Sequence, residues 1–404
     1  MRNLRLSTQK ARELIQKYGS PLYVYDETIL RERCREMAGL LSGFHHSVSY
    51  SAKANTNTAL LEMIRSEGID ADAMSPGEIY LEQLAGFTSD RIFYVCNNVS
   101  ADEMRYAIDR NIMVSVDSLE QLQLFGRINR GGAVAVRFNS GIGAGHHEKV
   151  VTSGRNTKFG VMKASLPEVK KLLSEYNLTL AGINQHIGSL FLDSSMFIES
   201  VKSFLEIAKD FPGLKFIDFG GGYGVPYRQE EQCLDLVKLR EAIRPILIDF
   251  INNYDNKDIL FKTEPGRYIV AECGVLLGTV SAVKQNYDTR YIGTDIGFNV
   301  LQRPIMYGSY HEIELLQDNP SEDKDIYTIV GNICETGDII AKDRKLSKPQ
   351  SGDTIQLFNA GAYGYSMASN YNCRLRPAEV LLTADGSDKL IRRRDTLEDL
   401  AKNF

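Results

Sequence analysis

Eight short runs of apolar and β-branched residues recur in the first two thirds of the chain, each followed by a stretch in which apolar residues repeat at helical spacing. The runs are 47–53, 69–74, 91–96, 112–117, 133–139, 180–189, 216–222 and 260–266. Runs of this length and composition are typical of buried strands. Eight strand–helix units within roughly 250 residues suffice for a (β/α)8 barrel of the TIM type. A doubly wound open sheet shows the same alternation, so both α/β folds stay open at this point.

The pattern changes after about residue 270, where strand-like runs are separated by Gly, Asp, Asn and Pro turns. These runs are 275–283, 327–330 and 354–357, and the segment 21–25 reads as a further strand of the same domain. We therefore expect two domains. A barrel would cover 28–272, and a β-rich, sandwich-like or barrel-like domain would combine 1–27 with 273–404.

Composition argues against several classes of protein. The 404 residues carry a formal net charge of −5 and no basic block, so neither nucleic acid nor an anionic membrane is an expected partner. No apolar stretch reaches the roughly 18 residues of a membrane span, and residues 1–20 lack the apolar run of a secretory signal. The six cysteines are scattered without a CxxC pair, which argues against zinc and disulfides and suits a reducing cytoplasm.

Polar residues stand where the predicted strands end, and in a barrel these positions share the C-terminal rim that holds active sites. Lys53 and Asp72 stand at the ends of the first two predicted strands. Partial burial disfavours the ammonium form of a lysine, so its amine becomes nucleophilic and able to form an imine. A surface lysine at a strand end is the alternative interpretation of Lys53.

Two motifs follow the seventh and eighth predicted strands, where barrels often bind phosphate. Gly220, Gly221 and Gly222 would let backbone amides approach an anion, although the run fits neither GxGxxG nor the P-loop. A tight turn with positive φ is the alternative. The motif Glu264-Pro265-Gly266-Arg267 supplies an acid that could keep a pyridine nitrogen protonated. A structural Glu–Arg pair within one loop is the alternative.

The sequence contains two histidine motifs, for which we expect different roles. In His186-Ile187-Gly188-Ser189, which closes the sixth predicted strand, the imidazole could stack on a cofactor ring and Ser189 could bind its phosphate. A lone histidine is more often a core residue. His146-His147-Glu148 looks like a metal cluster, but no partner ligand stands at helical spacing, so no metal is expected.

The predicted β-rich domain carries further candidates. Cys334, in a turn-rich segment, could act as a general acid, with a buried inert thiol as the alternative. Arg303 and Tyr307 offer a carboxylate clamp, because a guanidinium binds a carboxylate bidentately and a phenol adds one hydrogen bond. Tyr363 lies at another tight turn, Gly361-Ala362-Tyr363-Gly364.

In this order and spacing the motifs resemble those of the fold-type III pyridoxal-phosphate decarboxylases, and among them most closely the diaminopimelate decarboxylases. The resemblance covers nearly the whole chain, from 21–25 to 377–380. The segments that carry it are 50–55, 158–160, 186–189, 220–222, 264–267, 295–313, 334–338 and 361–363.

The resemblance implies a role for each motif. Lys53 would bind pyridoxal 5′-phosphate covalently, with His186 stacked on the ring and Glu264 paired with the pyridine nitrogen. The implied catalytic residues are Lys53, His186 and Cys334. The other implied cofactor-binding residues are Asp72, Ser189, Gly220, Gly221, Gly222, Gly266, Arg267 and Tyr363. The implied substrate-binding residues are Arg267, Arg303, Tyr307, Glu335 and Tyr363. Cys334 and Glu335 would come from the partner subunit of a homodimer with shared active sites.

Three positions depart from the commoner family pattern. Val99, Ser140 and Thr336 stand where a lysine, a proline and a serine are frequent. None has an assigned role in catalysis, but the departures leave a variant substrate open.

The expected reaction is decarboxylation of meso-2,6-diaminopimelate to L-lysine and carbon dioxide. This substrate has a second ammonium and a second carboxylate, which suit Glu335 together with Arg303 and Arg267. A decarboxylase of ornithine, arginine or a carboxylated polyamine shares the cofactor residues and is the first alternative. An amino-acid racemase and a catalytically inactive, regulatory homologue are the others.

Overall fold

The structure, a computed structural model, describes residues 3–142, 152–154 and 157–404 and divides into two compact units. The first, called here the β-rich unit, comprises Met1–Glu32, Pro226–Glu231 and Val270–Phe404. The second, the barrel unit, comprises Arg33–Val225 and Gln232–Ile269. The segment 226–231, expected within the barrel, thus belongs to the β-rich unit.

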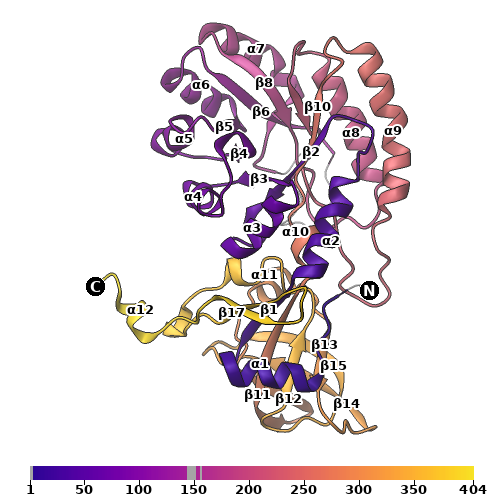
Figure 1. Ribbon diagram of the computed structural model, residues 1–404, viewed down its shortest axis with the longest axis vertical. Helices are drawn as coiled ribbons and strands as arrows, with labels where there is room; N and C mark the ends of the chain where they lie inside the picture. Colours follow the sequence, from indigo (N-terminus) through magenta and orange to yellow (C-terminus); the bar gives the residue numbers. More distant parts are fainter. Residues whose placement is uncertain (1–2, 143–151, 155–156) are drawn as a thin grey trace. The chain divides into compact units, whose positions relative to one another are not determined.

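The barrel unit is a closed ring of eight parallel strands (Figure 1). In chain order the strands are β2 (His46–Ser51), β3 (Asp70–Ala73), β4 (Ile92–Val95), β5 (Met113–Val116), β6 (Ala133–Asn139), β8 (Thr179–Asn184), β9 (Phe216–Asp218) and β10 (Leu260–Thr263). Their order around the ring is β5-β4-β3-β2-β10-β9-β8-β6, and pairing of β5 with β6 closes it. The predicted TIM-type barrel is therefore confirmed, because an open doubly wound sheet would leave two unpaired edges.

Helices lie outside the strands, and most begin at a residue whose side chain caps the first turn. The helices are α2 (Glu27–Ala38), α3 (Thr58–Ser66), α4 (Pro76–Leu84), α5 (Ala101–Ile108), α6 (Leu119–Ile128), α7 (Leu166–Glu175), α8 (Ser195–Ala208) and α9 (Leu236–Asn253). Asn57, Ser75, Ser100, Ser118 and Asp235 each accept a hydrogen bond from a backbone N–H of the turn that follows. Such caps satisfy N–H groups that lack a partner within the helix.

Aromatic rings fill the barrel interior. Phe93 and Phe216 meet edge to face with ring centroids 5.4 Å apart. They pack in a cluster with Val95, Ala135 and Ala181. Gly182 on β8 leaves room for this layer, because a Cβ there would lie 2.4 Å from the Phe216 ring. The small residue therefore lets β8 and β9 pair closely beside the large ring.

The β-rich unit is built on a mixed sheet in which β1 (Leu22–Asp26) pairs antiparallel with β11 (Gly274–Asn286) and parallel with β17 (Ala378–Leu382). This confirms the strand predicted at 21–25. The further strands are β12 (Thr289–Thr294), β13 (Ile313–Leu316), β14 (Lys324–Val330), β15 (Ile339–Ser347), β16 (Thr354–Leu357) and β18 (Asp388–Arg392). Helix α1 (Thr8–Tyr18) packs Ala11 and Leu14 into the hydrophobic cluster of this sheet.

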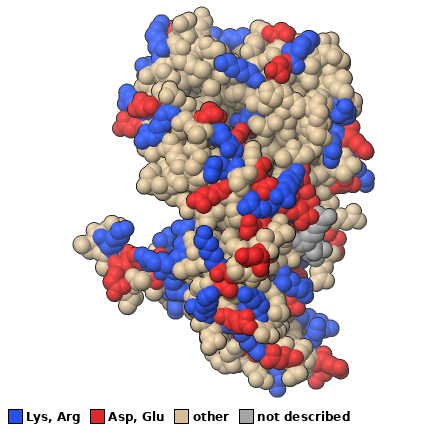
Figure 2. Space-filling view, viewed as in Figure 1, with Lys and Arg blue, Asp and Glu red and all other residues tan. Residues whose placement is uncertain are grey.

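Charge is spread over the surface. On the face drawn in Figure 2, basic and acidic side chains lie next to one another rather than in blocks of one sign. Within the described ranges, no helix combines the length and the apolar character that crossing a bilayer requires.

We predict that Gly182→Ala destabilises the protein by about 1–3 kcal/mol, the range for overpacking a core. The added methyl group would overlap the Phe216 ring. Denaturant unfolding of both proteins measures the difference. Gly77→Ala in the first turn of α4 is the matched control, because its methyl group would meet only the Ser75 hydroxyl at 3.6 Å. Equal unfolding midpoints for the two variants would contradict the packing argument.

Candidate active site

Three loops at the C-terminal ends of β8, β9 and β10 are joined by backbone hydrogen bonds that continue the parallel pairing. Gln185 N–H donates to the Asp218 carbonyl at 3.1 Å, and Phe219 N–H donates to the Lys262 carbonyl at 2.9 Å. Glu264 N–H donates to the Gly220 carbonyl at 2.9 Å. The residues predicted at the sixth, seventh and eighth strand ends therefore share one edge of the barrel.

The glycine run is required by contact between these backbones. A Cβ at Gly220 would lie 2.1 Å from the Gln185 carbonyl oxygen, and one at Gly221 would lie 2.1 Å from the Glu264 carbonyl oxygen. Gly220 also has φ of +75°, which glycine adopts without strain. Two amides of the run already have partners, since Gly220 N–H donates to Asp218 Oδ1 and Gly221 N–H donates to His186 Nδ1.

Lys53 lies one turn beyond its strand. The sequence pattern predicted that Lys53 closes the strand, but β2 stops at Ser51 and Lys53 is the middle residue of a 3-10 turn, Ala52–Ala54. The Tyr50 hydroxyl donates to the Asn55 carbonyl at 3.0 Å across this turn. His186 likewise follows β8, which ends at Asn184, rather than closing it.

Ser51 connects three strand ends. Its hydroxyl contacts Asp72 Oδ2 at 2.7 Å and the Glu264 carbonyl oxygen at 3.2 Å. Its N–H donates to the Pro265 carbonyl at 3.2 Å. Ser51 therefore links the start of the Lys53 turn to the ends of β3 and β10.

His186 is a neutral imidazole. Burial lowers its pKa well below the usual value, and the nearby cations Lys53 and Arg137 lower it further. Because Nδ1 accepts the Gly221 N–H at 3.1 Å, the ring proton belongs on Nε2. An uncharged ring at this edge can lie against another flat ring without the cost of a buried charge.

Burial raises the pKa of the carboxyl groups of the site. It raises the pKa of Glu264 well above the usual range, with a further increase from Asp218 and Asp72. It raises the pKa of Asp72 as well, against the opposing charge of Lys53. Lys53 therefore lies among Asp72, His186 and Glu264, close enough for its charge to act on all three.

Sequence analysis missed Arg137, a buried cation inside the barrel. It lies on β6 with 7% exposure, and its guanidinium is 4.5 Å from the centre of the Phe159 ring. Its charge acts on Asp72, Asp117 and Glu264. An arginine within the apolar run Ala133-Val134-Ala135-Val136-Arg137 was the available signal.

Arg267 and Ser189 form the remaining part of the edge. Arg267 is buried and begins α10 (Arg267–Val270), and its Nη2 donates to the Ser189 hydroxyl at 3.0 Å. Gly266, just before it, packs against Ser51 and Ala54, where a Cβ would come within 3.1 Å of each side chain.

The β-rich unit holds the other predicted residues. Arg303 and Tyr307 are the two ends of α11 (Arg303–Tyr307). Arg303 is 2% exposed, its Nη1 donates to His311 Nε2 at 3.0 Å, and its guanidinium lies 4.8 Å from the centre of the Tyr227 ring. His311 Nδ1 faces the Phe358 carbonyl at 2.8 Å, which fixes the tautomer that accepts from Arg303.

Cys334 and Glu335 lie in the exposed turn between β14 and β15. Cys334 N–H donates to Asn372 Oδ1 at 3.0 Å, and Glu335 accepts from the Tyr371 hydroxyl at 2.6 Å. The alternative interpretation of Cys334 as a buried inert thiol is therefore wrong.

Tyr363 has φ of +56°, consistent with the predicted tight turn.

The candidate metal motif His146-His147-Glu148 lies outside the described residues. Within the described ranges, no group of three His, Cys, Asp or Glu residues is placed to hold a metal ion.

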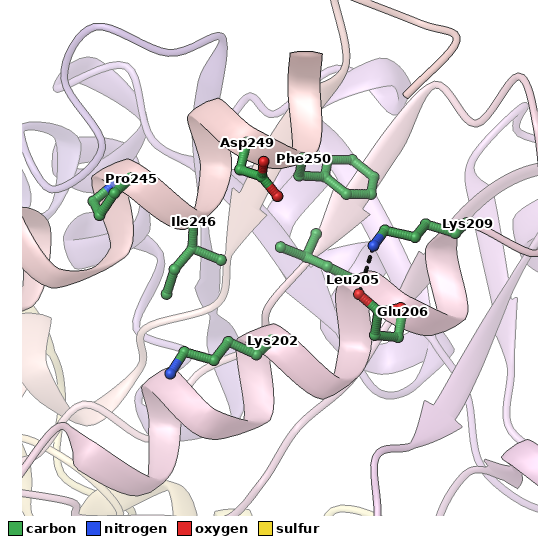
Figure 3. Close-up of a pocket in the computed structure, with 8 residues that line it drawn as sticks. All are labelled: Lys202, Leu205, Glu206, Lys209, Pro245, Ile246, Asp249 and Phe250. Carbon is green, nitrogen blue, oxygen red and sulfur yellow. Dashed lines mark hydrogen bonds and ion pairs between the residues drawn. The ribbon is translucent and has the colours of Figure 1, made fainter. Parts of the chain in front are cut away.

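A separate groove lies on the outer helices between α8 and α9 (Figure 3). Leu205 and Phe250 line it, together with Pro245 and Ile246. Lys209 at its edge is paired with Glu206 at 2.6 Å. None of these residues follows a barrel strand, so the groove is not part of the candidate site.

The sequence and the structure of this chain are similar to those of known pyridoxal-dependent decarboxylases. Residues 27–271 match the family model described as "Pyridoxal-dependent decarboxylase, pyridoxal binding domain". The diaminopimelate decarboxylase of Methanothermobacter thermautotrophicus is 42% identical over 401 residues, which cover 96% of this chain and 92% of that protein. The Escherichia coli K12 diaminopimelate decarboxylase is 34% identical over 417 residues, covering 98% and 96%. The crystal structure of Helicobacter pylori diaminopimelate decarboxylase complexed with L-lysine superposes with a TM-score of 0.89 at 32% identity, covering 97% and 98%.

Glu82 on α4 is a fully buried carboxyl group beside this site. Among the described residues neither of its oxygens has a hydrogen-bond partner. Burial raises its pKa well above the usual range, and the nearby carboxyls of Asp72 and Glu78 raise it further. Glu82 is therefore held as a neutral acid in the folded protein.

We predict that Glu82→Gln removes a pH-dependent loss of stability. A carboxyl whose folded-state pKa is raised contributes its full stability below the unfolded-state pKa of about 4.3 and loses it as pH rises towards the folded-state pKa. The free energy of unfolding of the wild type should therefore fall relative to Glu82→Gln by up to about 1.4 kcal/mol per pH unit in that window. Unfolding curves at a series of pH values measure this. Glu62→Gln, at an exposed position on α3, is the control. A Glu82→Gln curve parallel to that of the wild type would contradict the assignment.

Proposed function

Because the chain belongs to the diaminopimelate decarboxylase family of pyridoxal-dependent enzymes, we propose that it binds pyridoxal 5′-phosphate and converts meso-2,6-diaminopimelate to L-lysine and carbon dioxide. The observation that carries the proposal is the convergence of Lys53, His186 and Glu264 at one edge of the barrel. An amine, a neutral flat ring and a buried acid are the groups that a pyridoxal cofactor needs from its protein.

The residues present fit this cofactor. Glu264 Oε1 is buried, and among the described side chains and backbone groups no donor reaches it. Such an acid suits a pyridine nitrogen, which can form a hydrogen bond with it. Ser189 and Arg267, joined at the same edge, would hold the phosphate together with backbone amides of the loops. When bound, the cofactor supplies an electron sink for the bond that breaks.

The residues of the chain orient the groups and hold the protons. The Lys53 amine is the nucleophile. His186 presents an uncharged ring face, and Glu264 holds a proton at Oε1 or Oε2 for the ring nitrogen. The Cys334 thiol would deliver a proton to the α-carbon after carbon dioxide leaves.

Recognition of the substrate's far end is assigned to the β-rich unit. Arg303 has five N–H donors, and His311 occupies one of them. Its guanidinium would bind the distal carboxylate, with Tyr307 one helical turn further along α11. Glu335 would bind the distal ammonium. A substrate without the distal carboxylate would lose these charge-assisted hydrogen bonds.

We further propose a homodimer in which each active site takes Cys334 and Glu335 from the partner chain. In support, both residues lie in an exposed turn of the β-rich unit. The Tyr371 ring stacks on Phe298 with centroids 5.5 Å apart, and its hydroxyl orients the Glu335 carboxylate. Glu335 and Cys334, held on an exposed turn by these contacts, are suited to contribute to the active site of the partner chain.

We predict that the purified protein releases carbon dioxide from meso-diaminopimelate in preference to lysine, ornithine and arginine. Arg303→Met should lower kcat/KM for diaminopimelate by about 10- to 100-fold, because it removes charge-assisted hydrogen bonds of about 1.5–3 kcal/mol each. The same change should harm turnover of lysine far less. Carbon dioxide release from each substrate by both proteins measures the difference.

Arg344→Met is the matched control for this prediction. Arg344 is a half-buried cation of the same unit, and its Nη2 donates to the His311 carbonyl at 3.2 Å. This variant should keep the preference for diaminopimelate. If Arg303→Met slows all substrates equally, or lowers the unfolding temperature enough to account for the loss, Arg303 is a structural brace. Ornithine as the best substrate would overturn the proposed reaction.

We predict that mixing two inactive variants restores activity if the sites are shared. Lys53→Ala and Cys334→Ala should each lose about 100-fold or more of the wild-type turnover, the range for a nucleophile or a general acid. A heterodimer of the two would contain one site with both residues intact. Activity of the mixture, with subunit exchange followed by mass spectrometry of differently labelled chains, tests this. Full exchange without recovery would show that both residues serve the same site from one chain.

A further inference from the structure

Asp218, the last residue of β9, is a buried carboxyl to which the proposed function gives no role. It is completely buried. Its Oδ1 accepts the N–H of Gly220 at 2.8 Å, and its backbone carbonyl accepts the N–H of Gln185 at 3.1 Å. An aspartate that accepts from the amide two residues ahead forms an Asx turn. One carboxyl oxygen of Asp218 therefore sets the start of the glycine run.

The other side of Asp218 meets Glu264. Both side chains are buried, and side-chain hydrogen bonding between the two carboxyl groups lowers the pKa of Asp218 and raises that of Glu264. Carboxylates only accept hydrogen bonds, so this contact needs a proton on one of them. No N–H or O–H of the described residues reaches Asp218 Oδ2 or Glu264 Oε1. A single proton shared by the pair satisfies both oxygens.

The surrounding charges place that proton on Glu264. Burial raises the pKa of Asp218 to about 6, against the cation Lys262 on β10, which favours the ionised form. Burial raises the pKa of Glu264 well above its usual range, and Asp72 on β3 adds to this, while Lys53 opposes it. Tyr223, the remaining neighbour, is a buried phenol whose pKa burial also raises, so it stays neutral.

We propose that Asp218 is a positioning residue of the cofactor site, which sets the glycine turn with one oxygen and with the other holds Glu264 in its protonated form until a pyridine ring binds. The inference rests on the proposed function. When a pyridinium binds, the O–H bond of Glu264 breaks, its proton passes to solvent, and the carboxylate pairs with the ring N–H. A ring that arrives as the free base takes the proton instead.

The test counts protons. Pyridoxine 5′-phosphate, which lacks the aldehyde and cannot react with Lys53, is titrated into the full-length protein freed of cofactor. Calorimetry in buffers of different ionisation enthalpy gives the number of protons exchanged. In Asp218→Asn the amide oxygen can still accept from Gly220, but the negative charge beside Glu264 is gone and the amide nitrogen can donate to its carboxylate, so the ionised form of Glu264 is favoured. The wild type should therefore release about one more proton per site than this variant, whichever form of the ring binds.

Two further variants separate positioning from simple structural support. Asp117→Asn is the matched control, because Asp117 is another buried carboxyl at a strand end of the barrel and its partner is Asn97. It should exchange protons as the wild type does. Asp218→Ala removes both contacts and should weaken probe binding by about 10-fold or more, whereas Asp218→Asn should stay within about 10-fold, since a neutral hydrogen bond contributes around 1 kcal/mol.

Equal proton exchange in the wild type and Asp218→Asn would overturn the inference. If Asp218→Asn fails to fold, infrared spectra of the wild type decide the question. A carbonyl band of a protonated carboxyl should be present without the probe and disappear on binding, and its absence before binding would equally overturn the inference. Failure of the wild type to bind either the probe or pyridoxal 5′-phosphate would contradict the proposed function, and this inference with it.

Discussion

The close contact of three backbone segments at the ends of β8, β9 and β10 is the constraint on which the rest of the site depends. Gly220 and Gly221 lie so near the carbonyl groups of Gln185 and Glu264 that no side chain fits between them. The hydrogen bonds of the barrel therefore continue beyond the strands and hold His186 and Glu264 at fixed positions. The positions of these two side chains are therefore set by the backbone. Because the backbone is already ordered, little conformational entropy is lost when a ligand binds.

Removal of water from this edge determines its chemistry. Burial raises the pKa of the carboxyl groups here and lowers that of His186, so the neutral forms of these side chains are favoured. Lys53 and Arg137 are the opposing cations, and they limit how many carboxyls can be neutral at once. The same burial that costs folding free energy therefore provides an acid, a neutral ring and an amine within one small volume.

Much of this could be predicted from the sequence, because the signals are local. All eight barrel strands overlap the predicted runs, and β1 lies where a strand of the second domain was expected. Errors were concentrated at strand ends, where Lys53 and His186 follow their strands instead of closing them. In the β-rich unit β12, β13, β15, β17 and β18 were not predicted. Three of them, β12, β15 and β18, are partly exposed and so lack the continuous apolar run that marks a buried strand.

The sequence by itself determined the alternation of strands and helices, the capped helix starts and the positions of the glycine, histidine and acid motifs. These depend on neighbours within a few residues of each other. Only the tertiary structure decided which charged residues are buried. Arg137 reads as a break in an apolar strand, Asp218 as a turn residue and Glu82 as one of many helix-surface acids, yet all three are enclosed. The physical reason is that burial and protonation depend on groups from other strands, and no local pattern records which strands become neighbours when the barrel closes.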